Sequence, residues 1–307
     1  QGGTPHEETD VYSAISESCD VFFYNVAVEY TKAPDAFEPV FYFDYNLNAG
    51  AIVTEQKHVF DGLGIDAVAN DMQEKFWFGR PTGIELPEVS GLFPDPEWKR
   101  ETFEGEGWSV GDTINVSIGQ GEFTATPLQV ALNTGALGIG GRFFRPHLVS
   151  QRIDSEGNVT EIGAEKMGEL EIGAEHLAVV QEGMRQVVHE PNGTAHATAG
   201  ETKWPLTNPE GEEEILIGGK TGTAEYGAGD EGYDDPELNT GAKDSHAWFT
   251  CYAPWDDPEI AVAVVIEAGG EGSTVSVPVA DEVLRAYFEL TGRRERGTVL
   301  PVEKMPV

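Results

Sequence analysis

Apolar residues in the last third of the chain gather in short runs that predict three strands. The runs cover residues 215–224, 246–253 and 260–266, and polar residues, glycine or proline flank them. The third run, Ile-Ala-Val-Ala-Val-Val-Ile, is apolar on both faces, which is typical of a central strand covered on both sides. We therefore expect a sheet within residues 215–290.

Apolar residues spaced three or four positions apart predict two helices near these strands. In residues 174–188 the repeating positions are Leu177, Val180, Met184 and Val187. In residues 277–290 they are Val279, Val283, Tyr287 and Leu290. We expect each set to form the buried face of its helix.

The first 200 residues favour helices over strands. Residues 10–17 and 21–30 form two helical pieces, and the polar tripeptide Ser18-Cys19-Asp20 separates them. The Asp20 carboxylate is suited to cap the second piece, because it can accept hydrogen bonds from amides of the first helical turn. The sequence thus predicts a mainly helical region over residues 1–200 ahead of the strands.

Proline, glycine and acidic residues mark the loops. Residues 81–87 (PTGIELP) form a loop, and residues 201–214 form a polar, exposed one. Residues 226–245 form either a mobile flap beside the strand ends or a plain acidic loop, and we favour the loop. Thr126 and Pro127 are suited to begin a helix that runs to about residue 136.

The charge balance excludes one class of partner. The chain has 54 Asp and Glu against 19 Lys and Arg, a net charge of −35, so nucleic acid finds no basic cluster to bind. No window of about 18 apolar residues predicts a membrane span, and Gln1 does not open a secretory signal. We expect a segment of a longer protein, with its anchor upstream.

Cysteine and histidine give no sign of a metal or cofactor. Cys19 and Cys251 could form one disulfide or remain two separate thiols, and we favour separate thiols. The seven histidines are scattered without zinc-type spacing, and His246 is suited to a structural hydrogen bond. We expect no cofactor and no metal site.

The tetrapeptide Lys220-Thr-Gly-Thr223 carries the clearest chemistry. On an exposed strand it presents one cation, two hydroxyls and, at Gly222, a backbone amide with no side chain beside it. Such a set can bind a carboxylate while an amide stabilises the oxygen of a carbonyl under attack. A phosphate-binding loop is excluded, because Glu214 stands where its first glycine should be.

Ser18 is the second candidate, roughly 200 residues before Lys220. A serine between two helices is more often a helix cap than a catalyst. Together, however, the Ser18-Cys19-Asp20 and Lys220-Thr-Gly motifs resemble those of the penicillin-binding proteins and serine β-lactamases, whose set is S-x-x-K, S-x-N or S-D-N, and K-T-G.

The resemblance extends beyond these two motifs. The further similar segments are residues 14–24, 81–87, 117–121, 126–129, 246–249 and 253–254. They resemble class B penicillin-binding proteins, the monofunctional peptidoglycan D,D-transpeptidases, and Asp20 in place of Asn is similar to the elongation type. The resemblance implies one transpeptidase domain over residues 1–307 with an α/β (α+β) fold: an antiparallel sheet flanked by helices, plus a large helical region.

The resemblance also implies residue roles. Ser18 would relay a proton between the nucleophile and an amine, and Lys220 would orient Ser18 and add positive potential. Asp20 would contact the donor peptide, while Thr221 and Thr223 would hold the substrate carboxylate beside Gly222. The Thr223 amide would form half of the oxyanion hole, where losing one donor costs about 3 kcal/mol of barrier.

One family motif is missing from the 307 residues. No S-x-x-K occurs, and the nearest approximation, residues 54–57 (TEQK), has a threonine and follows Ser18. The nucleophile, its helix and the first strands of the sheet should therefore be absent. Three explanations remain open: an upstream part lies elsewhere, the chain is a non-catalytic relative, or the resemblance is misassigned. We favour the first.

The resemblance implies a function on the outer face of a bacterial membrane. The full protein would cross-link peptidoglycan stem peptides ending in D-Ala-D-Ala through a serine acyl-enzyme, and β-lactam antibiotics would acylate the same serine. Other cell-wall synthesis proteins would be its partners. The alternatives are a D,D-carboxypeptidase or β-lactamase, and a non-catalytic β-lactam sensor.

Overall fold

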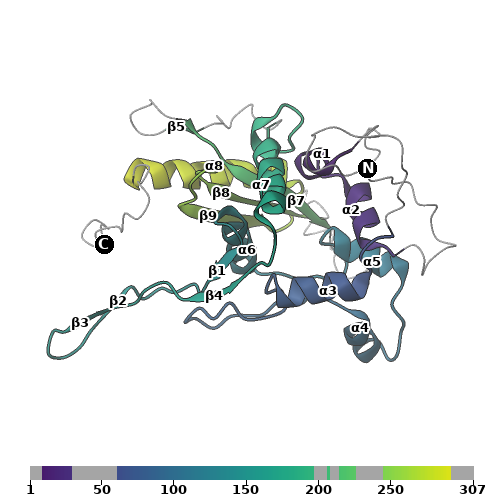
Figure 1. Cartoon of the computed structure of the whole chain (residues 1–307), viewed down its shortest axis with the longest axis horizontal. Helices are drawn as coiled ribbons and strands as arrows, with labels where there is room; N and C mark the ends of the chain where they lie inside the picture. The colour runs from purple at the N-terminus through teal and green to yellow at the C-terminus, as the bar shows by residue number, and fades with distance from the viewer. Residues whose placement is uncertain (1–8, 30–60, 197–205, 208–213, 226–244, 292–307) are drawn as a thin grey trace, which may run out of the picture. The chain divides into compact units, whose positions relative to one another are not determined.

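The computed structural model describes residues 9–29, 61–196, 206–207, 214–225 and 245–291 (Figure 1). These residues form two compact units. The first contains the described residues up to Asn133 together with Gly141–Gly173, and the second contains Thr134–Gly140 together with the described residues from Ala174 onward. Residues 226–244 of the expected 226–245 loop and most of the expected 201–214 loop lie outside the described residues, and Ser245 is already part of a strand.

The first unit is mainly helical, as the sequence predicts, and carries two small antiparallel strand pairs. Its helices are α1 (Val11–Ser16), α2 (Asp20–Ala27), α3 (Ile65–Glu74), α4 (Pro96–Thr102), α5 (Val110–Ser117) and the start of α6 (Pro127–Gly138). Its strands form the antiparallel pairs β1 (Arg142–Phe144) with β4 (Lys166–Glu169) and β2 (Gln151–Ile153) with β3 (Val159–Glu161).

An aromatic cluster holds much of the first unit together. Phe78, Phe93 and Val116 are buried in it, and the Phe123 ring packs edge-on against Phe78 with centroids 5.1 Å apart. Aromatic side chains bury more apolar area than most, so these rings supply much of the hydrophobic free energy here. The core fixes α3 and α5 relative to the segments that join them.

Helix α6 begins where the sequence predicts, and its first turn anchors a loop. The Gln129 backbone amide donates to the Thr126 hydroxyl, and the Thr126 backbone amide donates to the side-chain oxygen of Gln129, which together form a reciprocal cap. The buried Gln129 side chain also donates to the carbonyls of Arg80 and Ser90, which flank the 81–87 loop. Directly after that loop, the Glu88 carboxylate accepts from the Thr82 amide at 3.0 Å and so ties the two ends of the loop together.

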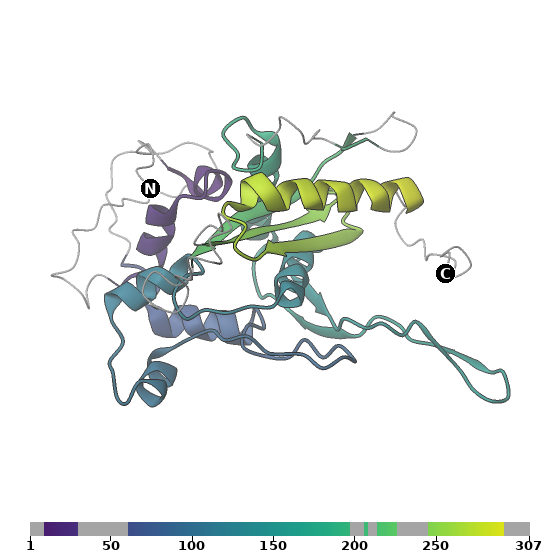
Figure 2. The same ribbon diagram turned by 180° about the vertical axis from the view of Figure 1, so that it is seen from behind.

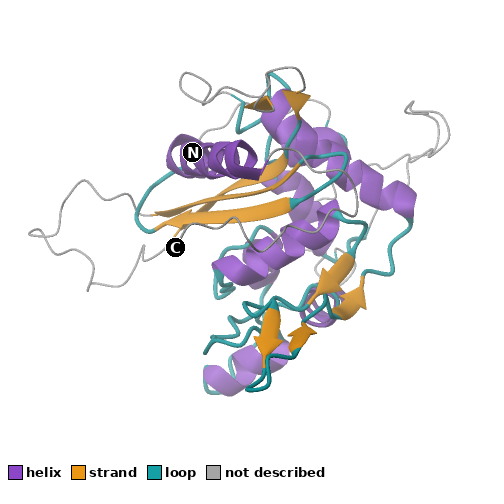
Figure 3. Cartoon of the chain, turned by 90° about the vertical axis from the view of Figure 1, so that its left-hand side faces the viewer, coloured by secondary structure: helices purple, strands orange, loops and turns teal. Residues whose placement is uncertain are grey.

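The second unit contains the sheet. Strands β7 (Gly218–Glu225), β8 (Ser245–Ala253) and β9 (Ile260–Ile266) form an antiparallel sheet in the order β7-β8-β9, coloured orange in Figure 3. A short pair, β5 (Leu206–Thr207) with β6 (Glu214–Ile215), precedes it. The three predicted strands are therefore confirmed.

Two long helices pack against this sheet. Helix α7 (Ala174–His189) lies along β7, and its bounds match the predicted 174–188. Helix α8 (Gly272–Thr291), yellow in Figure 2, packs on β8 and β9. It begins five residues before the predicted start and continues through Pro278.

The predicted buried face of α8 is wrong. Val279, Val283 and Leu290 are exposed, whereas the buried apolar residues are Val277, Ala280, Leu284 and Phe288. Both sets have helical spacing, so the pattern alone offers two faces. The sheet selects the face that carries Leu284 and Phe288.

The expected central position of the third strand is not observed within the described part of the chain. Strand β9 lies at an edge of the three-stranded sheet, and its residues are half-buried. It is nonetheless covered on both faces, because α8 packs on it and Gly135 of α6 comes close to Ala261. Because a helix covers each face of β9, its residues can be apolar on both faces even though β9 is an edge strand.

No described helix has both the length and the apolar content needed to cross a bilayer.

Candidate functional site

Strand β7 displays the Lys-Thr-Gly-Thr motif at an edge of the described sheet. Lys220 pairs with Thr250 of β8, Gly222 pairs with Trp248, and Thr223 pairs with Ala247. Alternate amides of an edge strand point away from its partner strand and can bind a ligand. The motif therefore lies on an exposed strand, as its chemistry requires, and not in a phosphate-binding loop.

Glycines let this strand lie close to its neighbours. A side chain at Gly219 would come within 2.8 Å of the Phe249 ring, and one at Gly222 within 3.1 Å of Trp248 Cβ. The first turn of α8 is closer still, since a Cβ at Gly272 would be 1.9 Å from the Trp248 carbonyl oxygen. The backbone around the motif is thus fixed by tight packing.

The motif side chains are partly exposed. Lys220 and Thr221 are half-buried and Thr223 is exposed. The Lys220 ammonium donates to the Thr221 carbonyl at 3.0 Å. The Thr221 hydroxyl lies 2.6 Å from the hydroxyl of Thr194, which follows α7. The strand thus presents one cation and two hydroxyls within four residues, a set that suits a carboxylate.

The Ser18 segment lies at a sharp turn between α1 and α2. Ser18 has φ = 56°, in the left-handed region that few residues other than glycine adopt, and a strained backbone is more frequent at functional sites than elsewhere. The Cys19 amide donates to the Ala14 carbonyl at 2.9 Å, and the Cys19 side chain is buried with Phe22. The turn is thereby held by the interior of the first unit.

The predicted cap at Asp20 is wrong in its position. Asp20 is the first residue of α2, and the capping residue is Cys19, which makes no side-chain cap. Asp20 is exposed, and its carboxylate in the first turn still suits the positive end of the helix dipole. The alternative reading of Ser18 as a cap also fails, because Ser18 lies two residues before the helix begins.

The two halves of the candidate site belong to different units. Ser18 and Asp20 lie in the first, and Lys220, Thr221, Gly222 and Thr223 lie in the second. Their convergence on one cleft stays a prediction.

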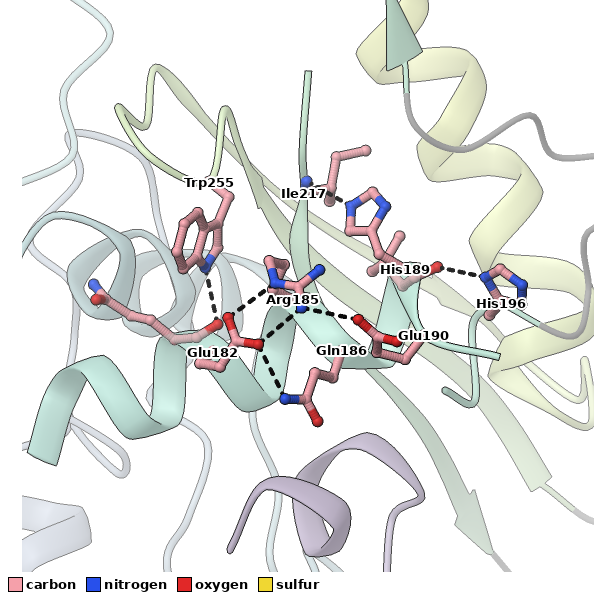
Figure 4. A network of polar contacts seen from close by, with 10 residues as sticks. Glu182, Arg185, Gln186, His189, Glu190, His196, Ile217 and Trp255 are labelled. Atoms are coloured by element: carbon pink, nitrogen blue, oxygen red, sulfur yellow. Dashed lines mark hydrogen bonds and ion pairs between the residues drawn. The ribbon is translucent and has the colours of Figure 1, made fainter. Parts of the chain in front are cut away.

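A polar network supports the start of β7 from α7 (Figure 4). The Ile217 amide donates to His189 Nε2 at 2.9 Å, so the His189 proton is on Nδ1. Burial, followed by the charge of Arg185, lowers the pKa of His189 to about 4. Arg185 itself is held by Glu182 at 2.8 Å and Glu190 at 2.9 Å. A neutral histidine thus fixes the strand three residues before Lys220.

The two cysteines and His246 have structural surroundings. Both cysteines are free thiols, each buried in its own unit, and burial raises the pKa of Cys251. His246 Nδ1 accepts from the Ala268 amide at 3.1 Å, which confirms the expected structural hydrogen bond. Within the described ranges, no cluster of His, Cys, Asp and Glu could hold a metal ion.

Residues 1–285 match the family described as the penicillin binding protein transpeptidase domain. The chain belongs to this family. Its relatives include peptidoglycan D,D-transpeptidase MrdA of Haemophilus influenzae, which is 34% identical over 291 residues. MrdA of Escherichia coli K12 is 30% identical over 305 residues.

These relatives are longer than the chain. The alignments cover 93% of the chain but 37% of the H. influenzae protein, and 98% of the chain but 40% of the E. coli protein. The chain thus spans less than half the length of these curated relatives.

Solved structures of penicillin-binding proteins share the fold. PBP2 of Pseudomonas aeruginosa, in complex with WCK 5153, has a TM-score of 0.63 and 28% identity, and the alignment covers 97% of this chain and 52% of the P. aeruginosa chain. PBP2 of Helicobacter pylori has a TM-score of 0.63 and 26% identity, and covers 94% and 41%. The expected α/β class, an antiparallel sheet with flanking helices and a helical region, is confirmed.

The sequence did not single out Thr194 or His189. Thr194 contacts β7 and His189 contacts the residue directly before it, across 27 and 28 residues of chain. The only local signal is the Asn192-Gly193-Thr194 segment directly after a predicted helix, which by itself indicates a turn.

Proposed function

We propose that the natural protein carrying this chain is a peptidoglycan D,D-transpeptidase. It forms a serine acyl-enzyme with stem peptides ending in D-Ala-D-Ala, releases D-alanine, and transfers the acyl group to an amine of a neighbouring strand. The observation that carries the proposal is the Lys220-Thr-Gly-Thr223 motif on an exposed edge strand. The relatives named D,D-transpeptidase support it.

The chemistry divides between the two units. Lys220 supplies positive potential, Thr221 and Thr223 bind the terminal carboxylate, and the Thr223 amide stabilises the carbonyl oxygen under attack. Ser18 relays a proton, and Asp20 contacts the donor peptide. The proposal therefore requires that Ser18 and the motif strand face one cleft in the working enzyme.

The proposal requires a nucleophile that the 307 residues do not contain. No S-x-x-K occurs among them, so the natural polypeptide must supply the serine and its lysine. The single-domain assignment for residues 1–307 depends on that same segment, which would complete the sheet with its first strands.

The setting follows from the proposed reaction. The substrate lies outside the cytoplasm, so the enzyme works on the outer face of the membrane, anchored by a segment beyond this chain. Its partners are stem peptides, β-lactam antibiotics and other cell-wall synthesis proteins. A related PBP2 from H. pylori has been solved in complex with MreC, which supports a partner of the last kind.

Labelling with a fluorescent penicillin tests the proposal. The protein expressed from its complete reading frame should form a covalent adduct, and Lys220→Ala should lower the labelling rate about 100-fold. Lys166→Ala is the matched control, because it removes an exposed lysine paired only with Glu169 among the described residues. A protein that folds and takes no label contradicts the proposal.

The fate of a stem peptide separates the alternatives. A transpeptidase gives a cross-linked product when an acceptor amine is present, whereas a D,D-carboxypeptidase gives only the shortened peptide. A β-lactam sensor takes label but releases no D-alanine. The products can be distinguished by mass spectrometry.

A further inference from the structure

The segment after α7 forms a turn that folds back on the end of the helix. The Gly193 amide donates to the Glu190 carbonyl at 2.9 Å, and the Ala195 amide donates to the Val187 carbonyl at 3.0 Å. Ala195 is fully buried. These bonds satisfy carbonyls that a helix end otherwise leaves unpaired, so the turn has one defined position.

Gly193 makes this close approach possible. A Cβ at this position would lie 2.2 Å from the Gln186 carbonyl oxygen and 2.4 Å from that of Val187. Both neighbours are helix backbone and cannot move aside cheaply. Residue 193 must therefore be glycine for the turn to seat on α7, and the next residue is Thr194.

The turn places Thr194 against the motif strand. The Thr194 hydroxyl oxygen lies 2.6 Å from that of Thr221, the second residue of the Lys-Thr-Gly-Thr motif. Four residues before Thr221, the Ile217 amide donates a hydrogen bond to His189 at the end of α7. The end of α7 thus holds β7 at two points, one before the motif and one inside it.

The direction of the Thr194–Thr221 hydrogen bond has a chemical consequence. Each hydroxyl has one proton to donate and can accept from others. When Thr221 binds a carboxylate, its proton points to the anion, because a carboxylate only accepts. Thr221 must then accept from Thr194, and this ordering strengthens its bond to the anion.

We propose that Thr194 is a positioning residue for the anionic end of the substrate. It donates to Thr221 and leaves the Thr221 proton directed at the terminal carboxylate of a peptide, or at the carboxylate of a β-lactam. This inference rests on the proposed transpeptidase function and adds a residue outside the three family motifs. Thr194 itself does not touch the reacting atoms.

A second threonine pair in the same unit provides a contrast. The hydroxyls of Thr134 and Thr250 are also 2.6 Å apart. The Thr250 hydroxyl, however, donates to the Val262 carbonyl at 3.1 Å, so its one proton serves the backbone of the sheet. This pair is structural, and Thr134→Val is a matched control for Thr194→Val.

The test compares two ligands that differ only in the carboxylate. The protein from its complete reading frame is acylated with benzylpenicillin and with benzylpenicillin methyl ester, and the ratio of the two second-order rate constants is measured. Thr194→Val should lower this acid-to-ester ratio about tenfold, as expected for a weakened hydrogen bond to an anion. Thr194→Ser, which keeps the hydroxyl, should restore it.

The controls separate positioning from stability. Thr134→Val should lower the thermal unfolding midpoint and leave the ratio at the wild-type value. Thr194→Ala provides a second variant without the hydroxyl, in case valine does not fit at the turn. A purely structural role predicts that the Thr194 variants slow acylation by both ligands equally.

The outcomes distinguish this inference from the function on which it rests. If the wild type reacts and the hydroxyl-deleting variants keep its ratio, the positioning role is refuted and the transpeptidase proposal stands. If the folded wild type reacts with neither ligand, both proposals fail.

Discussion

Protonation of His189 should loosen the strand that carries the Lys-Thr-Gly-Thr motif. Its Nε2 accepts the Ile217 amide at 2.9 Å, and a proton on Nε2 would turn the acceptor into a second donor. The titratable groups around the ring are Arg185, Glu190 and His196. Burial and the Arg185 cation keep its pKa at about 4, so the ring is neutral at pH 7.

The pKa shift gives the sign and size of the effect. An unfolded histidine titrates near pH 6.5, so between about pH 6.5 and pH 4 the unfolded chain binds a proton that the folded chain does not. The stabilisation from neutral His189 is therefore complete above about pH 6.5 and falls as the pH is lowered to 4. The window corresponds to about 3 kcal/mol in the free energy of unfolding.

Selective labelling of histidine Cε1 with ¹³C allows a direct measurement. The chain has seven histidines, and the resonance lost in His189→Gln identifies the ring. Its shift should stay constant from pH 8 to pH 5, while the protection factors of the β7 amides, which correct for the intrinsic pH dependence of hydrogen exchange, should fall below about pH 5. A His189 resonance that titrates at pH 6.5 or above would refute the reasoning. His196→Gln serves as the control, since His196 Nδ1 lies 3.3 Å from the Val188 carbonyl and contacts no strand amide among the described residues.

Three further predictions concern stability. Tyr252→Phe should raise the free energy of unfolding by about 1 kcal/mol in urea titrations, because the buried Tyr252 hydroxyl has no hydrogen-bond partner among the described residues; a loss of stability would contradict this. Gly272→Ala should lower the free energy of unfolding by about 3 kcal/mol, because the added Cβ would meet the Trp248 carbonyl. Gly163→Ala is the control and should be neutral, because the space around Gly163 is open. Equal unfolding midpoints for the two variants would count against the close packing of α8. In thermal unfolding, Leu284→Asp should lower the free energy of unfolding by about 4 kcal/mol, because Leu284 is buried, and Val283→Asp should lower it by about 0.5 kcal/mol or less, because Val283 is exposed. The reverse order would support the α8 face that the sequence pattern favoured.

Local chemistry made several elements predictable. Thr126 and Pro127 start α6 because a hydroxyl cap and a fixed φ both favour a first helical turn. Leu177 and Val187 set the period of α7. The three strands followed from apolar runs, and the motif strand from its position within one of them. These features depend on residues a few positions apart, so the sequence alone carries them.

Other features depend on which surfaces meet. The α8 sequence offers two apolar faces, and packing on the sheet decided for Leu284 over Val283. The apolar third strand lies at an edge of the described sheet, and two helices cover its faces. Backbone conformation at Ser18 likewise needed the tertiary fold, because interior packing of Cys19 holds the left-handed turn.

The sequence by itself determined the family, the helix and strand types, and the residues able to bind a carboxylate, because motifs and periodicity are local properties. The tertiary structure alone decided that His189 and Thr194 hold the motif strand. Those contacts join residues 27 or 28 positions apart, and their hydrogen bonds form only when α7 packs along β7. No local pattern encodes that distance, since it results from the packing of whole elements.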